Sequence, residues 1–300
     1  MNRLGKSDIY ISELTLGCMS LDVDDSDSAK IINLALDRGI NHLDTADLYQ
    51  FGKNEKMIGE IIKERRQDII LTTKVGNHFN SNTKSWFWDP SKEYIYQAVD
   101  ASLQRLQTDY IDLYLLHGGT IDDPIDETIE AFEQLKKSGK IRAYGISSIR
   151  PNVIHEYLKR SSIDAIMMQY NMLDQRPAEL LDLLYTNRVS ILARGPFAKG
   201  MLSNQALDYI TEKGKDGYLN YTRDELLLTV QNLRNLNVPL TKLSLQFVLH
   251  HPAVSSAVFG VSTLDQLNDN LKYAHITPLE AEFLKTIKQL TKPVFYTSHR

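Results

Sequence analysis

The stretch that decides the fold is residues 41–55, which read NHLDTADLYQFGKNE. Its first three residues are expected to form a short buried strand, because they follow a helical pattern that ends at Gly39. The chain then turns polar and enters a second amphipathic pattern. Asp44 and Tyr49 therefore lie just after a strand. In a parallel barrel of strands and helices, that end of the strands carries the chemistry.

The same stretch suggests an acid–base site. A tyrosine is a poor acid at neutral pH, since its ordinary pKa is about 10, but a nearby cation favours the phenolate. Lys74 ends the next apolar run and supplies such a cation. His117 ends the predicted strand after that. Asp44, Tyr49, Lys74 and His117 thus follow three consecutive predicted strands.

The pattern around this stretch extends over the whole chain, as eight predicted strands separated by helices. A small hairpin of residues 2–4 and 9–11 precedes them. The strands are expected at residues 14–17, 41–43, 69–74, 111–116, 141–146, 165–168, 189–193 and 255–259. The helices are expected at residues 26–38, 54–64, 90–106, 125–138, 151–160, 177–187, 223–235, 241–250, 264–272 and 278–290.

This alternation favours an α/β fold, a (β/α)8 TIM barrel with a short N-terminal β-hairpin, over a doubly wound sheet. The first strand is not followed by the glycine-rich G-x-G-x-x-G turn of dinucleotide-binding sheets, which agrees with that choice. Composition does not change along the chain in a way that would mark a linker. Residues 1–300 are therefore expected to form one domain.

Composition narrows the class of protein. A net charge of −4 argues against a nucleic-acid-binding surface, which needs a basic stripe. The single cysteine, Cys18, excludes an internal disulfide and indicates the cytoplasm. No apolar run approaches the length of a membrane span, and the N-terminus is too polar for a signal peptide. The basic cluster at residues 63–66 is interpreted as a solvated helix end.

Residues 76–89 form a long excursion that is rich in aromatic side chains, including Trp86 and Trp88. A loop of this kind is often functional. The tryptophans would then form an apolar wall of a substrate pocket, shaped also by residues 18–24, 118–123 and 197–222. The alternative is that they only attach the excursion to the barrel.

Several stretches, in the same order, resemble the aldo-keto reductase superfamily, and most closely its bacterial general oxidoreductases. They are residues 4–7, 14–19, 43–49, 73–74, 102–117, 139–147, 169–171 and 195–200. The resemblance implies a barrel that binds a nicotinamide cofactor and reduces small-molecule aldehydes or ketones. It implies no metal, and it leaves the oligomeric state open.

By this resemblance, Asp44, Tyr49, Lys74 and His117 occupy the family's catalytic tetrad. Tyr49 would donate a proton to the carbonyl oxygen as hydride arrives at the carbon. Lys74 would reduce the cost of forming the phenolate, and Asp44 would hold Lys74 charged and oriented. His117 would hydrogen-bond the carbonyl oxygen and set its angle to the cofactor.

The resemblance also implies cofactor contacts. The residues that match them are Gly17, Cys18, Met19, Asp44, Ser147, Ser148, Gln169, Arg194, Gly195, Pro196, Phe197, Lys199, Gly200, Gly260, Ser262, Thr263, Gln266 and Asn270. Ser148 stands where the family often has Asn, and Arg194 stands where many members stack an aromatic ring on the nicotinamide. A guanidinium plane can also stack.

At the adenosine end, the family usually places Lys or Arg against the 2′-phosphate of NADPH. Here the matching positions are Gly260, Ser262, Thr263 and Gln266. Hydroxyl groups and the start of helix 264–272 can also receive a phosphate. NADPH is the expected cofactor, and NADH is left open.

Two other functions remain open. One is a lyase or aldolase that uses Lys74 as a Schiff base. The other is a sensor that binds the cofactor with little turnover.

Overall fold

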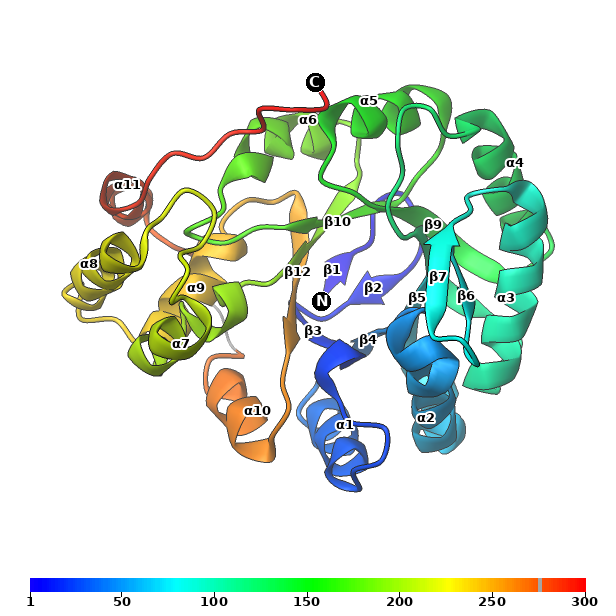
Figure 1. Cartoon of the computed structure of the whole chain (residues 1–300), viewed down its shortest axis with the longest axis horizontal. Coiled ribbons are helices and arrows are strands. Elements are labelled where there is room, and N and C mark those ends of the chain that lie inside the picture. The colour runs from blue at the N-terminus through cyan, green and yellow to red at the C-terminus, as the bar shows by residue number, and fades with distance from the viewer. Residues whose placement is uncertain (275–276) are drawn as a thin grey trace.

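The computed structural model describes residues 1–274 and 277–300, and its centre is a closed barrel of eight parallel strands (Figure 1). Each strand is buried along nearly its whole length, because helices cover the outside and side chains fill the inside. Going round the barrel, the strands are β3 (Leu14–Gly17), β4 (His42–Asp44), β5 (Ile70–Val75), β8 (Ile111–Leu116), β9 (Ile141–Ser147), β10 (Ala165–Gln169), β11 (Ser190–Arg194) and β12 (Val254–Gly260).

An antiparallel hairpin closes the amino-terminal end of the barrel. It consists of β1 (Asn2–Arg3) and β2 (Tyr10–Ile11), and Figure 1 shows it in the centre of the ring. Leu4, Ile9 and Ile11 are fully buried in one cluster with inward-facing residues of the barrel strands. The predicted TIM barrel with its N-terminal hairpin is confirmed.

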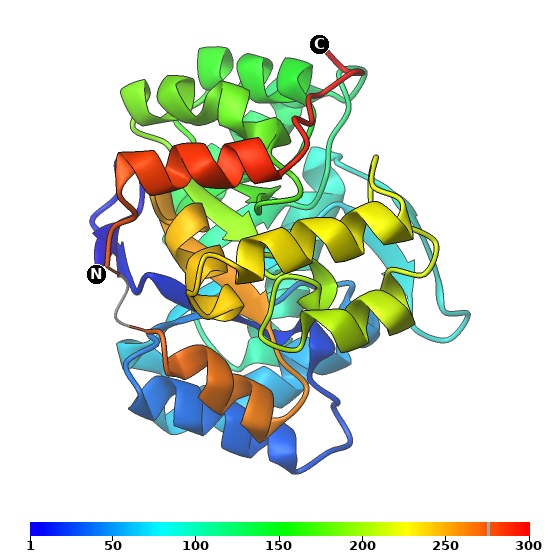
Figure 2. The ribbon, with the colours of Figure 1, turned by 90° about the vertical axis from the view of Figure 1, so that its left-hand side faces the viewer.

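The helices form the outer layer, with their apolar faces towards the strands. They are α1 (Asp27–Asp37), α2 (Lys53–Ile62), α3 (Lys92–Leu106), α4 (Ile125–Lys137), α5 (Pro151–Arg160), α6 (Leu181–Thr186), α7 (Ala206–Lys213), α8 (Arg223–Arg234), α9 (Leu240–Val248), α10 (Leu264–Leu271) and α11 (Ala281–Leu290). Short 3-10 turns η2 (Tyr49–Gly52), η3 (Lys63–Asp68) and η5 (Ala198–Gly200) lie between them. Figure 2 shows α7 and α8 side by side on the outside of the barrel.

The excursion at 76–89 is more ordered than a loop. It folds into a second antiparallel hairpin, β6 (Asn77–Asn80) with β7 (Ser85–Trp88). His78 is stacked between the rings of Phe87 and Tyr94, with centroids 4.7 and 4.2 Å away. The Trp88 indole donates to Asp123 Oδ1 at 3.0 Å. These contacts attach the hairpin to α3 and to the loop after β8.

The structure corrects two local expectations. Arg66 was expected in a solvated helix end, but it is buried in η3 and pairs with the fully buried Asp112 at 2.9 Å. Pro90 was expected at the first turn of α3, but the N-cap is the next residue, Ser91, whose hydroxyl accepts from Tyr94 N. Among the described residues, no helix has the length and apolarity needed to cross a bilayer.

Candidate active site

Four of the predicted site residues come together where three neighbouring strands end. Asp44 is the last residue of β4, and Tyr49 begins η2 after the loop of residues 45–48. Lys74 is the penultimate residue of β5, and β5 is paired with both β4 and β8. His117 follows β8, and its backbone N–H donates to Val75 O at 2.7 Å. Parallel pairing therefore carries residues distant in sequence to one rim of the barrel.

The ammonium group of Lys74 is the centre of this group. Its Nζ lies 2.7 Å from Asp44 Oδ1, 2.7 Å from the carbonyl oxygen of Thr45 and 3.3 Å from the hydroxyl of Tyr49. The side chain of Lys74 is 1% exposed. A buried ammonium with three partners in fixed directions has one orientation, so the hydroxyl of Tyr49 is held in place as well.

Burial and neighbouring charges shift the pKa values of Lys74 and Tyr49 in opposite directions. Burial alone would lower the pKa of Lys74, but the charge of Asp44 and contact with Tyr49 outweigh it and raise that pKa. Lys74 therefore stays protonated at neutral pH. Burial raises the pKa of Tyr49, and the charge of Lys74 offsets only part of that rise. Tyr49 thus holds its proton until a reaction draws it away.

His117 completes the group as a neutral imidazole. Its ring stands edge-on to Tyr49, with centroids 5.9 Å apart. Burial first, and then the charges of Lys74 and Arg194, lower the pKa of His117 to about 3. Its Nδ1 is buried and has no hydrogen-bond partner among the described residues. A neutral ring keeps one N–H that can be donated to a bound oxygen atom.

The four side chains line a cavity of about 740 Å³. The cavity runs from the tetrad, past the ends of β9 to β12, to the start of α10. Fifteen of the residues expected to bind the cofactor line it. They are Gly17, Met19, Asp44, Ser147, Gln169, Arg194, Gly195, Pro196, Phe197, Lys199, Gly200, Gly260, Ser262, Gln266 and Asn270.

Three of the expected contacts do not line this cavity. Cys18 is fully buried, and its Sγ faces Leu16 O at 3.6 Å. Ser148 is buried, and its hydroxyl accepts from Arg150 N at 3.2 Å. Thr263 caps α10 through a bond from Gln266 N. Each of these side chains has a structural partner that holds it outside the cavity wall.

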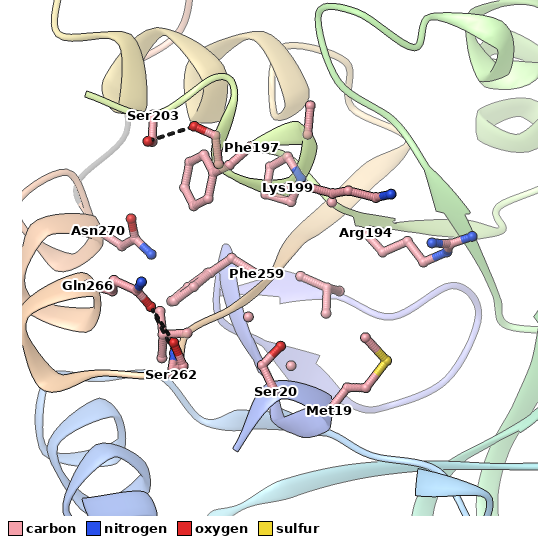
Figure 3. Close-up of a pocket in the computed structure, with 18 of the residues that line it drawn as sticks. Met19, Ser20, Arg194, Phe197, Lys199, Ser203, Phe259, Ser262, Gln266 and Asn270 are labelled. Carbon is pink, nitrogen blue, oxygen red and sulfur yellow. Dashed lines mark hydrogen bonds between the residues drawn. The ribbon is translucent and has the colours of Figure 1, made fainter. Parts of the chain in front are cut away.

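The far end of the cavity is polar and lies against α10 (Figure 3). Gln266 Oε1 accepts from the backbone N of Ser262 at 2.8 Å, and Gln266 Nε2 donates to the hydroxyl of Tyr209 at 3.0 Å. Figure 3 shows Asn270 beside Gln266, with Phe197 and Phe259 on the facing walls. Amide groups and aromatic rings of this kind suit a flat polar base such as adenine.

The sequence predicts that residues 197–222 shape the pocket, but it did not single out Tyr209, Lys213 or Tyr218 as cavity residues. Tyr209 and Lys213 belong to α7, and Tyr218 follows it; all three line the cavity. The ammonium of Lys213 lies 4.9 Å from the centroid of the Tyr209 ring. The apolar pair Ala206 and Ile210, four residues apart and both buried, was the one available signal of this helix.

The cavity fits an elongated ligand such as a dinucleotide. Glycines open its wall: Gly195 has a φ of +66°, and a Cβ added there would have only the side chain of Gln169 within 4 Å. A Cβ at Gly260 would lie 3.2 Å from Ser20 Oγ, another cavity residue. Amide side chains line the cavity both beside the tetrad, at Gln169, and against α10, at Gln266 and Asn270, which suits a molecule that has two different heads. No group of three or more His, Cys, Asp or Glu residues in the described part of the chain is arranged to hold a metal ion.

Comparison with known proteins decides the family. The family model described as "Aldo/keto reductase family" matches residues 13–292. The chain belongs to the aldo/keto reductase family. Carbonyl reduction is the general reaction of these oxidoreductases, and their cofactors are nicotinamide nucleotides.

Individual relatives agree with this. The chain is 50% identical to an uncharacterized oxidoreductase, YqkF of Bacillus subtilis, over 99% of this chain and 98% of the relative. The holo form of the aldo-keto reductase AKR11C1 from Bacillus halodurans superimposes with a TM-score of 0.95 at 54% identity, covering 100% of this chain and 98% of that one. An NADH-specific methylglyoxal reductase of Escherichia coli is 29% identical, over 93% of this chain and 94% of the relative.

Proposed function

We propose that this aldo/keto reductase reduces small aldehydes or ketones to alcohols, with NADPH as the preferred hydride donor and Tyr49 as the proton donor. The observation that carries the proposal is the contact of Lys74 Nζ with both Asp44 and the Tyr49 hydroxyl, in a cavity that suits a dinucleotide.

Each of the four side chains has a role in this scheme. When bound in this cavity, a reduced nicotinamide would supply the hydride to the carbonyl carbon. The carbonyl oxygen gains negative charge and takes the proton of Tyr49. Lys74 stabilises the phenolate left behind, and Asp44 keeps Lys74 charged and in place. The neutral ring of His117 donates a hydrogen bond to the same oxygen, which fixes the angle of the carbonyl group.

Other cavity residues would hold the cofactor. Ser147 and Gln169 lie near the tetrad, where their hydroxyl and amide groups suit the carboxamide of the nicotinamide. The backbone of residues 195–200 would face the pyrophosphate. Gln266 and Asn270 would face the adenine at the start of α10.

The preference for NADPH is supported by Lys213. Positively charged groups are absent from the start of α10 in this chain, but α7 brings Lys213 to the same cavity, next to Tyr209, and Tyr209 bonds to Gln266. An ammonium group there would attract the 2′-phosphate that distinguishes NADPH from NADH. We further propose that the protein acts in the cytoplasm on a small-molecule substrate and binds neither a membrane nor a nucleic acid.

The two alternative functions, a Schiff-base lyase or aldolase and a cofactor-binding sensor, require different properties of the site. A Schiff base requires a neutral lysine amine, whereas Lys74 has a raised pKa and three hydrogen-bond partners. A sensor would bind the cofactor with little turnover. A plant relative described as a probable voltage-gated potassium channel subunit beta is 28% identical to this chain.

The test combines binding with turnover in one preparation. NADPH and NADH are titrated against tryptophan fluorescence, and oxidation of the bound nucleotide is followed with a panel of small aldehydes. Tyr49→Phe is expected to bind NADPH like the parent and to lose most of kcat, because only the proton donor is missing. Undiminished turnover by Tyr49→Phe would overturn the assignment. Binding without turnover in the parent would favour the sensor.

A further inference from the structure

Arg194 gives the nicotinamide end of the cavity an unbalanced positive charge. It is the last residue of β11 and stands in register with Gln169 at the end of β10. Its Nη1 donates to Gln169 Oε1 at 3.1 Å. That partner is a neutral amide, and in the described part of the chain no carboxylate forms an ion pair with Arg194. The charge of Lys74, by contrast, is balanced by Asp44 at 2.7 Å.

The charge of Arg194 reaches the reacting groups. It contributes to lowering the pKa of His117, after burial and the charge of Lys74. It also acts to lower the pKa of Asp44 and of Tyr49, in both cases against the larger effect of burial. Arg194 lines the same cavity as Tyr49, Lys74 and His117. A ring seated between Gln169 and the tetrad would therefore lie within the field of this guanidinium group.

The two forms of a nicotinamide cofactor respond differently to that field. The oxidised ring carries one positive charge, whereas the reduced ring carries none. A fixed cation nearby therefore repels the oxidised form and leaves the reduced form almost unaffected. An aromatic side chain at this position would act in the opposite direction, because its face attracts a cationic ring.

Resting on the proposed function, we propose that Arg194 makes this site bind the reduced cofactor more tightly than the oxidised one. Hydride donation turns a neutral ring into a cationic one, so product formation itself weakens the contact with Arg194 and favours release of the spent cofactor. Arg194 thus favours loading of the reduced cofactor and release of the oxidised one, and leaves the overall equilibrium of the reaction unchanged. Because its side chain is exposed, solvent screens part of the charge, and the expected discrimination is about tenfold.

The test measures a ratio of dissociation constants rather than activity. Kd is determined for NADP⁺ and NADPH by calorimetry with the wild type, Arg194→Lys and Arg194→Tyr. Adenosine, pyrophosphate and 2′-phosphate groups are common to both ligands, so the ratio reports the charge of the nicotinamide ring. We expect Kd for NADP⁺ to exceed that for NADPH by about tenfold in the wild type and to remain higher in Arg194→Lys. In Arg194→Tyr the ratio should fall to one or below.

A second measurement needs no variant. The excess in the wild-type ratio should shrink as potassium chloride is raised, because salt screens an exposed charge. A ratio that is the same in the wild type and Arg194→Tyr, or that ignores salt, would overturn the role of Arg194. If the wild type binds neither nucleotide, the proposed function fails instead, and the two failures are distinct.

Discussion

Replacing Lys74 with methionine is expected to destabilise the folded protein by about 3–5 kcal/mol at neutral pH. Methionine retains most of the apolar stem but removes the ammonium group, which leaves the buried carboxylate of Asp44 without its cation. At an effective dielectric constant near 20, two unit charges 2.7 Å apart attract each other by roughly 6 kcal/mol. Part of this attraction offsets the cost of burying the two ions, so the net loss is smaller than the gross figure.

The loss of folding stability in Lys74→Met should be larger at high pH than at low pH. Burial holds the pKa of Asp44 above its ordinary value, and the charge of Lys74 is the strongest influence opposing that rise. Without Lys74 the pKa of Asp44 rises further. A group whose pKa is higher in the folded state than in the unfolded state destabilises the fold at pH values above its unfolded-state pKa. The penalty should therefore be smaller at about pH 5 than at about pH 8, because Asp44 then takes up a proton.

Urea denaturation, followed by circular dichroism at both pH values, measures the loss. Lys30→Met is the matched control, since Lys30 also lies 2.7 Å from a carboxylate, that of Asp27, but on the exposed surface of α1. An exposed pair contributes little, so this control should stay close to the wild type. Adding Asp44→Asn to Lys74→Met should restore part of the stability. A loss below about 1 kcal/mol for Lys74→Met, or an equal loss at both pH values, would refute the reasoning.

Two further outcomes are expected. Lys213→Gln should weaken NADPH binding about tenfold and leave NADH binding unchanged. The control Lys215→Gln, on the exposed surface after α7, should change the affinity for neither nucleotide. If Lys213→Gln binds NADPH as tightly as the wild type does, Lys213 does not belong to the 2′-phosphate site. Burial lowers the pKa of both His42 and His117 to about 3, below the ordinary value near 6.5. Between these two pH values the unfolded chain binds more protons than the folded chain does. The free energy of unfolding should therefore fall as pH is lowered, by about 1.4 kcal/mol per pH unit for each histidine. Urea denaturation at two pH values in this range should show a shallower fall for His117→Asn than for the wild type, and identical slopes would contradict the buried neutral state of His117.

The barrel could be predicted because its signal is local and repeated. Each strand is a short apolar run, and each helix has one apolar face, so the alternation itself specifies the architecture. The rim residues Asp44, Lys74 and His117 could be placed for the same reason, since a polar residue that ends a buried strand must lie at the rim. Tyr49 followed from its position just after such a strand.

The parts that escaped prediction depend on contacts between distant segments. Arg66 has the sequence context of a surface helix end, and only the barrel brings it to Asp112. Helix α7 is short and its apolar face is narrow, so Lys213 could not be assigned to the cavity from the sequence. Cys18 directly follows β3 and Asp44 ends β4, but Cys18 is packed in the apolar core instead of lining the cavity, and a one-residue change of side-chain direction cannot be read from periodicity.

Closure of the barrel between β3 and β12 has a consequence for synthesis on the ribosome. β3 leaves the ribosome long before one of its two neighbours, β12, is made, because the two strands lie more than 200 residues apart in the chain. The hairpin is in the same situation, because Asn2 Nδ2 donates to Ser255 O and Gly5 N donates to Ser190 Oγ. One edge of β3 thus stays unpaired through most of translation, and unpaired strand edges promote aggregation. Nascent chains that stall before residue 254 should therefore depend on chaperones far more than the finished protein does.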